Sequence, residues 1–165
     1  MIPGYGFLLN NELTDFNFAP LQPGVPDPNL PGPGKRPRSS MSPTIVVEDG
    51  RPILSVGSPG GATIITTVAQ VITEHLDRRR PLVDAIAAPR LSSRNGSESI
   101  EPALLSSPDG AALKVMGHGF TKQDVIGNAA AIRIWGNGDF EAAAETSRRG
   151  GGSAMVVRPD EQGGR

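Results

Sequence analysis

The chain has 165 residues, of which 20% are charged and 37% are hydrophobic, and its formal net charge at pH 7 is −1. This length accommodates one domain with a real core, and the nearly balanced charge argues against nucleic acid as a partner. The absence of cysteine excludes disulfides, the two scattered histidines predict no metal site, and no apolar run is long enough to predict a membrane span.

Polar side chains directly follow the first predicted element, a short buried strand at residues 6–10 centred on Phe7, Leu8 and Leu9. Glu12 and Asp15 stand three residues apart, so one turn of backbone can aim both carboxylates at a cation. The alternative is a simple turn, because Asn and Asp favour turns through side-chain-to-backbone hydrogen bonds. This alternative accounts for a single polar residue, but it accounts less well for the spacing of Glu12 and Asp15.

A proline-rich stretch occupies residues 19–38 and contains seven prolines. This density excludes a helix and deprives a sheet of backbone donors. A connection of this length is usually a lid or a linker, and we interpret it as a lid because only one strand precedes it. The basic residues at its end, Lys35, Arg36 and Arg38, are followed by Ser39 and Ser40, whose hydroxyls can donate to a carboxylate. A solvated basic patch followed by a serine turn is the more common interpretation of such a run taken alone.

The middle of the chain predicts a hairpin, residues 44–56 around Asp49 and Gly50, followed by a long helix from Thr63 to about Arg78. Gly60 and Gly61 lie in the turn between them. Glycine permits a close approach of the backbone, and the first N–H groups of the helix have no intrahelical partner, so this turn can bind an oxygen anion. A tight turn that simply needs small residues is the alternative, and it is the commoner one on local sequence alone.

The remaining elements follow from start, stop and turn signals. They are a helix at 81–88, an edge strand at 99–101, a helix from the N-cap Ser107 to Gly117, a hairpin of 129–135 with 139–144, a flexible basic bend at 146–152 and a last strand at 154–157. Hairpins imply antiparallel pairing, so the order of elements predicts an α+β fold in which helices cover an antiparallel sheet. We expect a domain at 1–158 and a disordered tail at 159–165.

Three polar runs in this order resemble the C-terminal part of the γ-glutamyltranspeptidase family, the glutathione hydrolases, which have an N-terminal-nucleophile fold. The matching runs are 8–12 with Asp15 and Phe16, 35–37 with 39–44, and 57–61 with 64–67; residues 87–90 also fit. The resemblance implies an αββα sandwich and weakens after Arg90.

The resemblance also implies a role for each polar run. Glu12 and Asp15 would hold the α-amino group of a γ-glutamyl substrate such as glutathione. Ser39 and Ser40 would bind its α-carboxylate, and the N–H groups at 60–61 would form the oxyanion hole. The proline-rich stretch would lie where some members carry a lid. No metal or cofactor is implied, and members are often exported to the periplasm or secreted.

Two parts of the family pattern are not matched in this sequence. The nucleophile is a threonine that autocleavage frees upstream of the first matching run, and the large subunit supplies an arginine. We therefore expect a fragment of a γ-glutamyl transferring or hydrolysing enzyme that is inactive alone. A cephalosporin-acylase-like amidohydrolase is the rival enzyme, and a non-catalytic remnant that binds a partner chain is the alternative of another class.

Overall fold

The computed structural model describes residues 3–6, 9–96 and 98–157. The chain forms two compact units, an N-terminal unit (residues 1–40) and a C-terminal unit (residues 41–165). Phe7 and Leu8, the predicted tail 159–165 and residue 158 lie outside the described residues. No described helix is both long enough and apolar enough to cross a bilayer.

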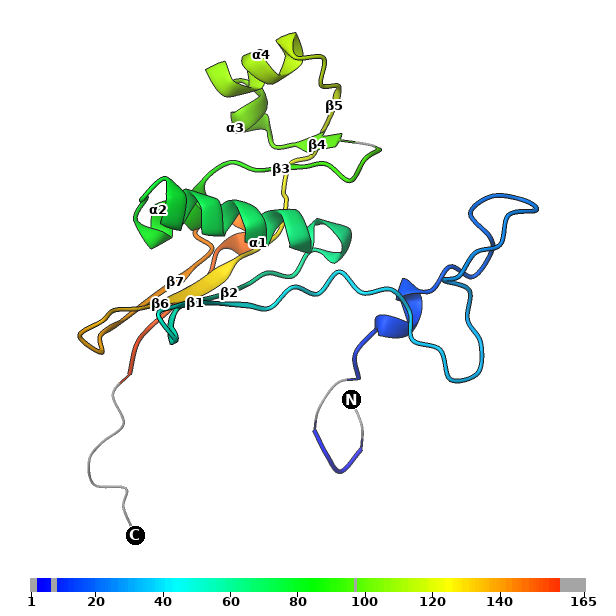
Figure 1. Cartoon of the computed structure of the whole chain (residues 1–165), viewed down its shortest axis with the longest axis horizontal. Coiled ribbons are helices and arrows are strands. Elements are labelled where there is room, and N and C mark those ends of the chain that lie inside the picture. Colours follow the sequence, from blue (N-terminus) through cyan, green and yellow to red (C-terminus); the bar gives the residue numbers. More distant parts are fainter. Residues whose placement is uncertain (1–2, 7–8, 97, 158–165) are drawn as a thin grey trace. The chain divides into compact units, whose positions relative to one another are not determined.

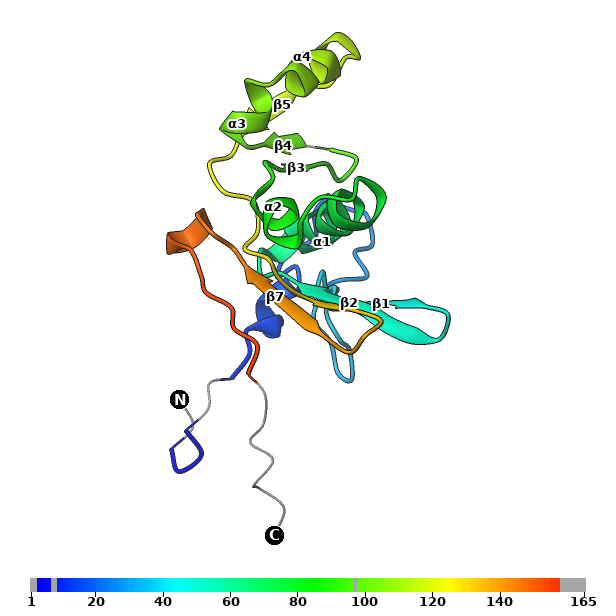
Figure 2. The same cartoon turned by 90° about the vertical axis from the view of Figure 1, so that its left-hand side faces the viewer.

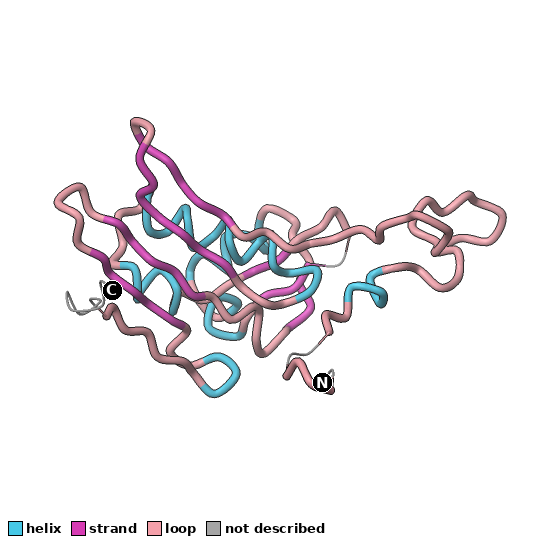
Figure 3. The backbone as a smooth tube through the Cα atoms, turned by 90° about the horizontal axis from the view of Figure 1, so that it is seen from below, coloured by secondary structure: helices cyan, strands magenta, loops and turns pink. Residues whose placement is uncertain are grey.

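The C-terminal unit contains a four-stranded antiparallel sheet of order β1-β2-β6-β7, called here the large sheet (Figures 1 and 3). Its strands are β1 (Thr44–Glu48), β2 (Arg51–Gly57), β6 (Ala130–Ile134) and β7 (Phe140–Ala144). Both predicted hairpins are confirmed. Asp49 and Gly50 have φ of 49° and 77°, the pair of positive values that a type I′ turn requires.

The predicted helix after the glycine turn is confirmed as three continuous segments. They are the 3₁₀ turn η2 (Gly61–Thr63), α1 (Ile64–Ile72) and the π-helix η3 (Thr73–Asp77). With α2 (Leu82–Ala87), which confirms the predicted helix at 81–88, they cover one face of the large sheet (Figures 1 and 2). Ile65 departs from the predicted buried apolar face, since its side chain is 55% exposed.

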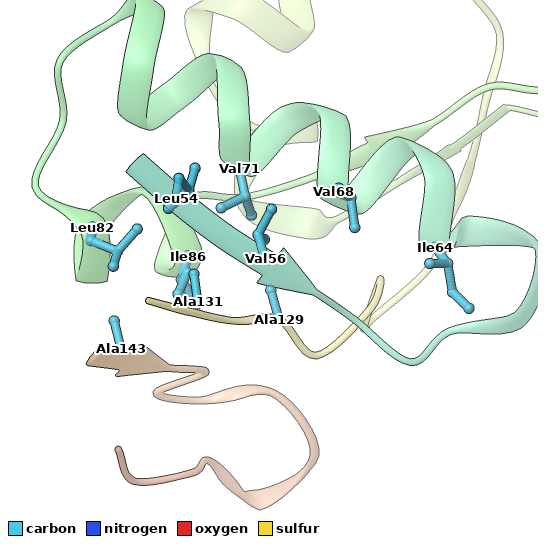
Figure 4. Packing of buried hydrophobic residues seen from close by; sticks show 10 residues of the cluster. All are labelled: Leu54, Val56, Ile64, Val68, Val71, Leu82, Ile86, Ala129, Ala131 and Ala143. Atoms are coloured by element: carbon cyan, nitrogen blue, oxygen red, sulfur yellow. The ribbon is translucent and has the colours of Figure 1, made fainter. Parts of the chain in front are cut away.

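The core of the C-terminal unit lies between these helices and the large sheet (Figure 4). Leu54 and Val56 project from β2 toward Val68 and Val71 of α1. The opposite face of the sheet carries the row Ile45, Ser55, Ile132 and Ala142, in which both isoleucines are exposed. The α+β class is therefore confirmed, with one helical layer on one face of the antiparallel large sheet.

A smaller three-stranded sheet of order β3-β4-β5 follows α2. Its elements are β3 (Leu91–Ser92), β4 (Glu98–Ile100), α3 (Pro102–Leu105), α4 (Pro108–Val115) and β5 (Phe120–Lys122). The Ser107 cap is confirmed, since its hydroxyl accepts from Gly110 N at 3.1 Å. The edge position predicted for 99–101 is wrong, because β4 is the middle strand and pairs in parallel with β5, which the sequence did not predict.

Four charged side chains are buried together where α2, β4 and β7 end. Arg148 donates to Glu101 at 2.6 and 2.7 Å and to both oxygens of Glu145 at 3.0 Å, and Arg90 contacts Glu145 at 3.2 Å. Burial would raise the pKa of Glu101, but hydrogen bonds from Arg148 and from backbone N–H groups outweigh it and lower that pKa. Both arginines also donate to the carbonyl of Ile86, and Arg148 donates to that of Ala88 at 2.8 Å. This cluster satisfies carbonyls at the end of α2 that the helix leaves unpaired.

Three further predictions need correction. Leu9 belongs to no strand and is 73% exposed, because no neighbouring strand among the described residues is there to pair with it. Residues 154–157 form no strand and are exposed, for the same reason. The bend at 146–152, expected to be flexible, contains the 3₁₀ turn η4 (Arg148–Gly150), and its Arg148 side chain is buried.

Candidate functional site

The two carboxylates predicted to bind an amine lie on one short helical turn of the N-terminal unit. Glu12 and Asp15 are the first and last residues of the 3₁₀ helix η1 (Glu12–Asp15). Residues i and i+3 eclipse in a 3₁₀ helix, so both side chains leave the same side of the turn. Within the described part of the chain, the Asp15 carboxylate accepts no hydrogen bond and forms no ion pair, and the side chain is exposed.

The proline-rich stretch is folded around one carboxylate, Asp27. Its oxygens accept from the Asn17 amide at 2.8 Å and from the backbone N–H groups of Asn29 at 2.9 Å and Leu21 at 3.3 Å. The hydrogen bond from Asn17, followed by that from Asn29, lowers the pKa of Asp27. The stretch therefore has a defined conformation without any helix or strand of its own.

Asn29 joins the two predicted substrate-binding runs. Its amide nitrogen donates to the Asp15 carbonyl at 2.7 Å, and its amide oxygen accepts from the N–H of Arg38 at 2.8 Å. Arg38 directly precedes Ser39 and Ser40. One side chain thus fixes the backbone beside the candidate amine site and the backbone beside the candidate carboxylate site.

The glycine turn of the C-terminal unit presents unused backbone donors. Gly60 has φ 149° and Gly61 has φ 55°, so both adopt conformations that favour glycine. Neither N–H has an acceptor among the described residues, whereas the Gly60 carbonyl accepts from the N–H of Thr63 at 3.2 Å. The turn leads through η2 into α1, so the positive end of the helix dipole adds to the attraction for an anion.

A second loop, residues 127–128, packs against the glycine turn. The hydroxyl of Ser58 accepts from the N–H of Asn128 at 2.9 Å and donates to the Pro59 carbonyl at 2.7 Å. A Cβ on Gly127 would lie 2.5 Å from Thr67 Oγ1, so only glycine fits there. Asn128 Oδ1 is buried and accepts no hydrogen bond within the described residues. These contacts hold the glycine turn in the conformation that leaves the N–H groups of Gly60 and Gly61 without acceptors.

The structure brings together part of the predicted site. Glu12, Asp15, Ser39 and Ser40 belong to the N-terminal unit, and Gly60 and Gly61 belong to the C-terminal unit. Convergence of all three runs on one ligand therefore stays a prediction. Sequence reasoning missed Asp27, Asn29 and Gly127, although an Asp and an Asn two residues apart within a proline-rich run are a recognisable turn signal.

Known proteins resemble this chain over most of its length. The family model described as "Gamma-glutamyltranspeptidase" matches residues 1–155. The "Glutathione hydrolase proenzyme" of Bacillus subtilis (strain 168) is 43% identical over 157 residues, which cover 91% of this chain and 25% of the relative. The chain thus spans about a quarter of the length of the curated relatives it matches.

Solved structures agree with this match. An acivicin-inhibited γ-glutamyltranspeptidase superposes with a TM-score of 0.78 at 36% identity, covering 90% of this chain and 84% of that one. A mutant of the Helicobacter pylori γ-glutamyltranspeptidase gives a TM-score of 0.75 at 37% identity, covering 87% of this chain and 83% of the other.

Proposed function

Because the chain belongs to the γ-glutamyltranspeptidase family, we propose that it supplies the substrate-binding and oxyanion-stabilising part of a γ-glutamyl transferase or hydrolase. The enzyme would transfer the γ-glutamyl group of glutathione and related compounds to water, amino acids or peptides. The observation that carries this proposal is the link through Asn29 between the backbones of Asp15 and Arg38.

The argument from Asn29 is geometric. A glutamyl head carries its ammonium and its carboxylate on one carbon atom, so a selective pocket needs an anion and a set of donors close together. Asp15 with Glu12 would accept from the ammonium group, and Ser39 with Ser40 would donate to the carboxylate. The loop between these two runs, residues 19–38, would act as a lid on the same pocket.

The chemistry assigned to Gly60 and Gly61 is stabilisation of the tetrahedral intermediate. A threonine hydroxyl attacks the γ-carbonyl carbon while its own α-amine takes the proton. The carbonyl oxygen becomes an anion, and the two N–H groups donate to it. Collapse breaks the amide bond, and the proton passes to the departing amine. Water or an acceptor amine then attacks the γ-glutamyl ester. The threonine and the carboxylate-binding arginine would come from a partner segment, the large subunit of the same precursor.

The test is co-expression of this chain with a family large subunit and the nucleophilic threonine, followed by assay of a γ-glutamyl anilide and of the matching glutaryl anilide. The glutaryl compound lacks only the α-amino group. We expect Asp15→Ala to lower kcat/KM for the γ-glutamyl compound by roughly 30-fold to several thousandfold, because the substrate ammonium loses its charged partner. Activity on the glutaryl compound should change less than about threefold. This compound has no ammonium group for Asp15 to bind, and substitutions of exposed residues usually have small effects.

Two results would contradict the proposal. Equal loss on both anilides would show that Asp15 does not bind the amine. Preference of the unsubstituted enzyme for the glutaryl compound would favour the acylase alternative. Asp124→Ala serves as the matched control, since this carboxylate is exposed in the C-terminal unit and pairs only loosely, at 3.6 Å, with Lys122.

A further inference from the structure

A separate pocket of 460 Å³ lies at the other end of the helix that begins at the glycine turn. The helix from Ile64 to Asp77 is about 20 Å long, so the pocket is remote from Gly60 and Gly61. Its walls come from η3 and the turn after it, the start of α2, and strands β6 and β7 with their flanks. Its polar and aromatic members are His75, Arg79, Arg80, Arg133, Trp135 and Glu141.

Strand register explains how an arginine comes to lie under the helices. Arg133 pairs with Leu54 on one side and with Glu141 on the other. Leu54 is fully buried against the helices, so this row faces the helical layer and not the open face of the sheet. Arg133 therefore projects from the floor of the pocket.

The Arg133 guanidinium has donors that the described residues leave unused. Its Nε and Nη1 are hidden from solvent and find no acceptor there, and no ion pair within those residues joins it to Glu141. The guanidinium carbon lies 5.1 Å from the centre of the Trp135 ring. Stacking on an aromatic ring attracts the cation but leaves its in-plane N–H groups without acceptors. Neighbouring atoms therefore shield Nε and Nη1, whereas Nη2 is neither hidden nor bonded within the described residues and can donate to a ligand in the pocket. Because a partly buried guanidinium is normally paired, this nitrogen points to a ligand that brings an acceptor.

The turn on the opposite wall adds a second available cation. Arg80 is held by Glu74, with Nε 3.0 Å from a carboxylate oxygen, and its carbonyl contacts His75 Nδ1 at 2.8 Å. Arg79 forms no ion pair within the described residues and has φ 57°, a backbone conformation that arginine rarely adopts. This strained residue lies two positions after the end of the π-helical segment at Asp77, and both features concentrate at functional sites.

We propose that this pocket binds a small, doubly charged tetrahedral oxyanion of the phosphate type. Arg133 and Arg79 donate to its oxygens from opposite walls, and Trp135 borders the bound ion. Arginine suits this task because its fork of N–H groups matches the spacing of two oxyanion oxygens. The site is independent of the glutamyl pocket and of the nucleophile.

The experiment uses the full chain and the fluorescence of Trp135, which is the only tryptophan in the sequence. Inorganic phosphate is titrated against chloride at constant ionic strength, and succinate is titrated in parallel. We expect a saturable fluorescence change with phosphate and weaker binding of succinate. Arg79→Asn should weaken phosphate binding at least tenfold while it preserves the backbone, since asparagine tolerates positive φ.

Arg149→Asn is the matched control, because Arg149 is also exposed, also has φ near 50° and lies outside the pocket. It should change the affinity less than twofold. The proposal is overturned if phosphate gives no saturable change, if both variants lose affinity equally, or if succinate binds more tightly than phosphate. Phosphate should also raise the Tm of the unsubstituted chain, because a ligand that binds the folded state stabilises it. Arg133→Gln should abolish this rise, and a rise that persists in the variant would overturn the proposal.

Discussion

The two units of the chain are stabilised by different kinds of interaction. The C-terminal unit packs ten buried apolar side chains between its sheet and helices and encloses the cluster of Arg90, Glu101, Glu145 and Arg148. In the described part of the N-terminal unit, Phe16 is the one buried apolar side chain, and the loop is folded by hydrogen bonds to Asp27 and Asn29.

This difference predicts different unfolding behaviour. Burial of apolar surface is the dominant driving force for folding, whereas one hydrogen bond contributes only about 1 kcal/mol net. The C-terminal unit should therefore unfold cooperatively. The N-terminal unit should open locally at a much lower cost, which suits a segment proposed to close over a substrate.

The largest expected effect is in the buried charge cluster. Arg148→Met removes the side chain that donates to both Glu101 and Glu145, and it leaves two carboxylates buried with too few donors. We expect a loss of about 3–5 kcal/mol in the free energy of unfolding, measured by urea denaturation followed by circular dichroism. Arg149→Asn, one residue along and exposed, should cost no more than about 0.5 kcal/mol. A loss below about 1 kcal/mol for Arg148→Met would show that the cluster does not stabilise this unit.

Elements with a local signal could be predicted from the sequence. The turn at Asp49 and Gly50, the cap at Ser107 and the apolar period after Thr63 each depend on residues close in the chain, and each is confirmed. The charge cluster could not be predicted in this way. Arg90 and Glu145 are 55 positions apart, so the pairing that allows both charges to be buried leaves no signal in the local sequence.

The candidate site shows the same division. The carboxylates on η1 and the glycine turn were recognisable from spacing and residue type, because a single turn of backbone creates each of them. The bridge made by Asn29 spans 14 positions to Asp15 and crosses a loop without regular structure. The failed strand at Leu9 has a related cause, since an apolar run predicts burial only where another segment supplies a partner.

A smaller effect on stability is expected in the N-terminal unit, which is stabilised mainly by hydrogen bonds. Asn29→Ala removes the bonds to the Asp15 carbonyl and to the Arg38 N–H, which together should cost about 1–2 kcal/mol of local stability. Amide exchange at Arg38 should accelerate by roughly 5- to 30-fold, while the urea midpoint of the C-terminal unit stays unchanged. Gln22→Ala, an exposed change in the same loop, should alter neither measurement. A shift of the global midpoint by Asn29→Ala would mean that the two units unfold together.

The smallest expected effect is the acid sensitivity of the same loop. Hydrogen bonds from Asn17 and Asn29 lower the pKa of Asp27 in the folded loop, so its carboxylate stabilises the loop above the ordinary aspartate pKa of about 3.9. That contribution is lost as the pH falls through the lowered pKa, because protonation removes the acceptor that the backbone N–H groups need. In an NMR titration, the amide signals of Leu21 and Asn29 should move in one step below about pH 4. Asp27→Asn should abolish the step. If the step persists in this variant, the acid response belongs to another carboxylate, and Asn29 alone holds the loop.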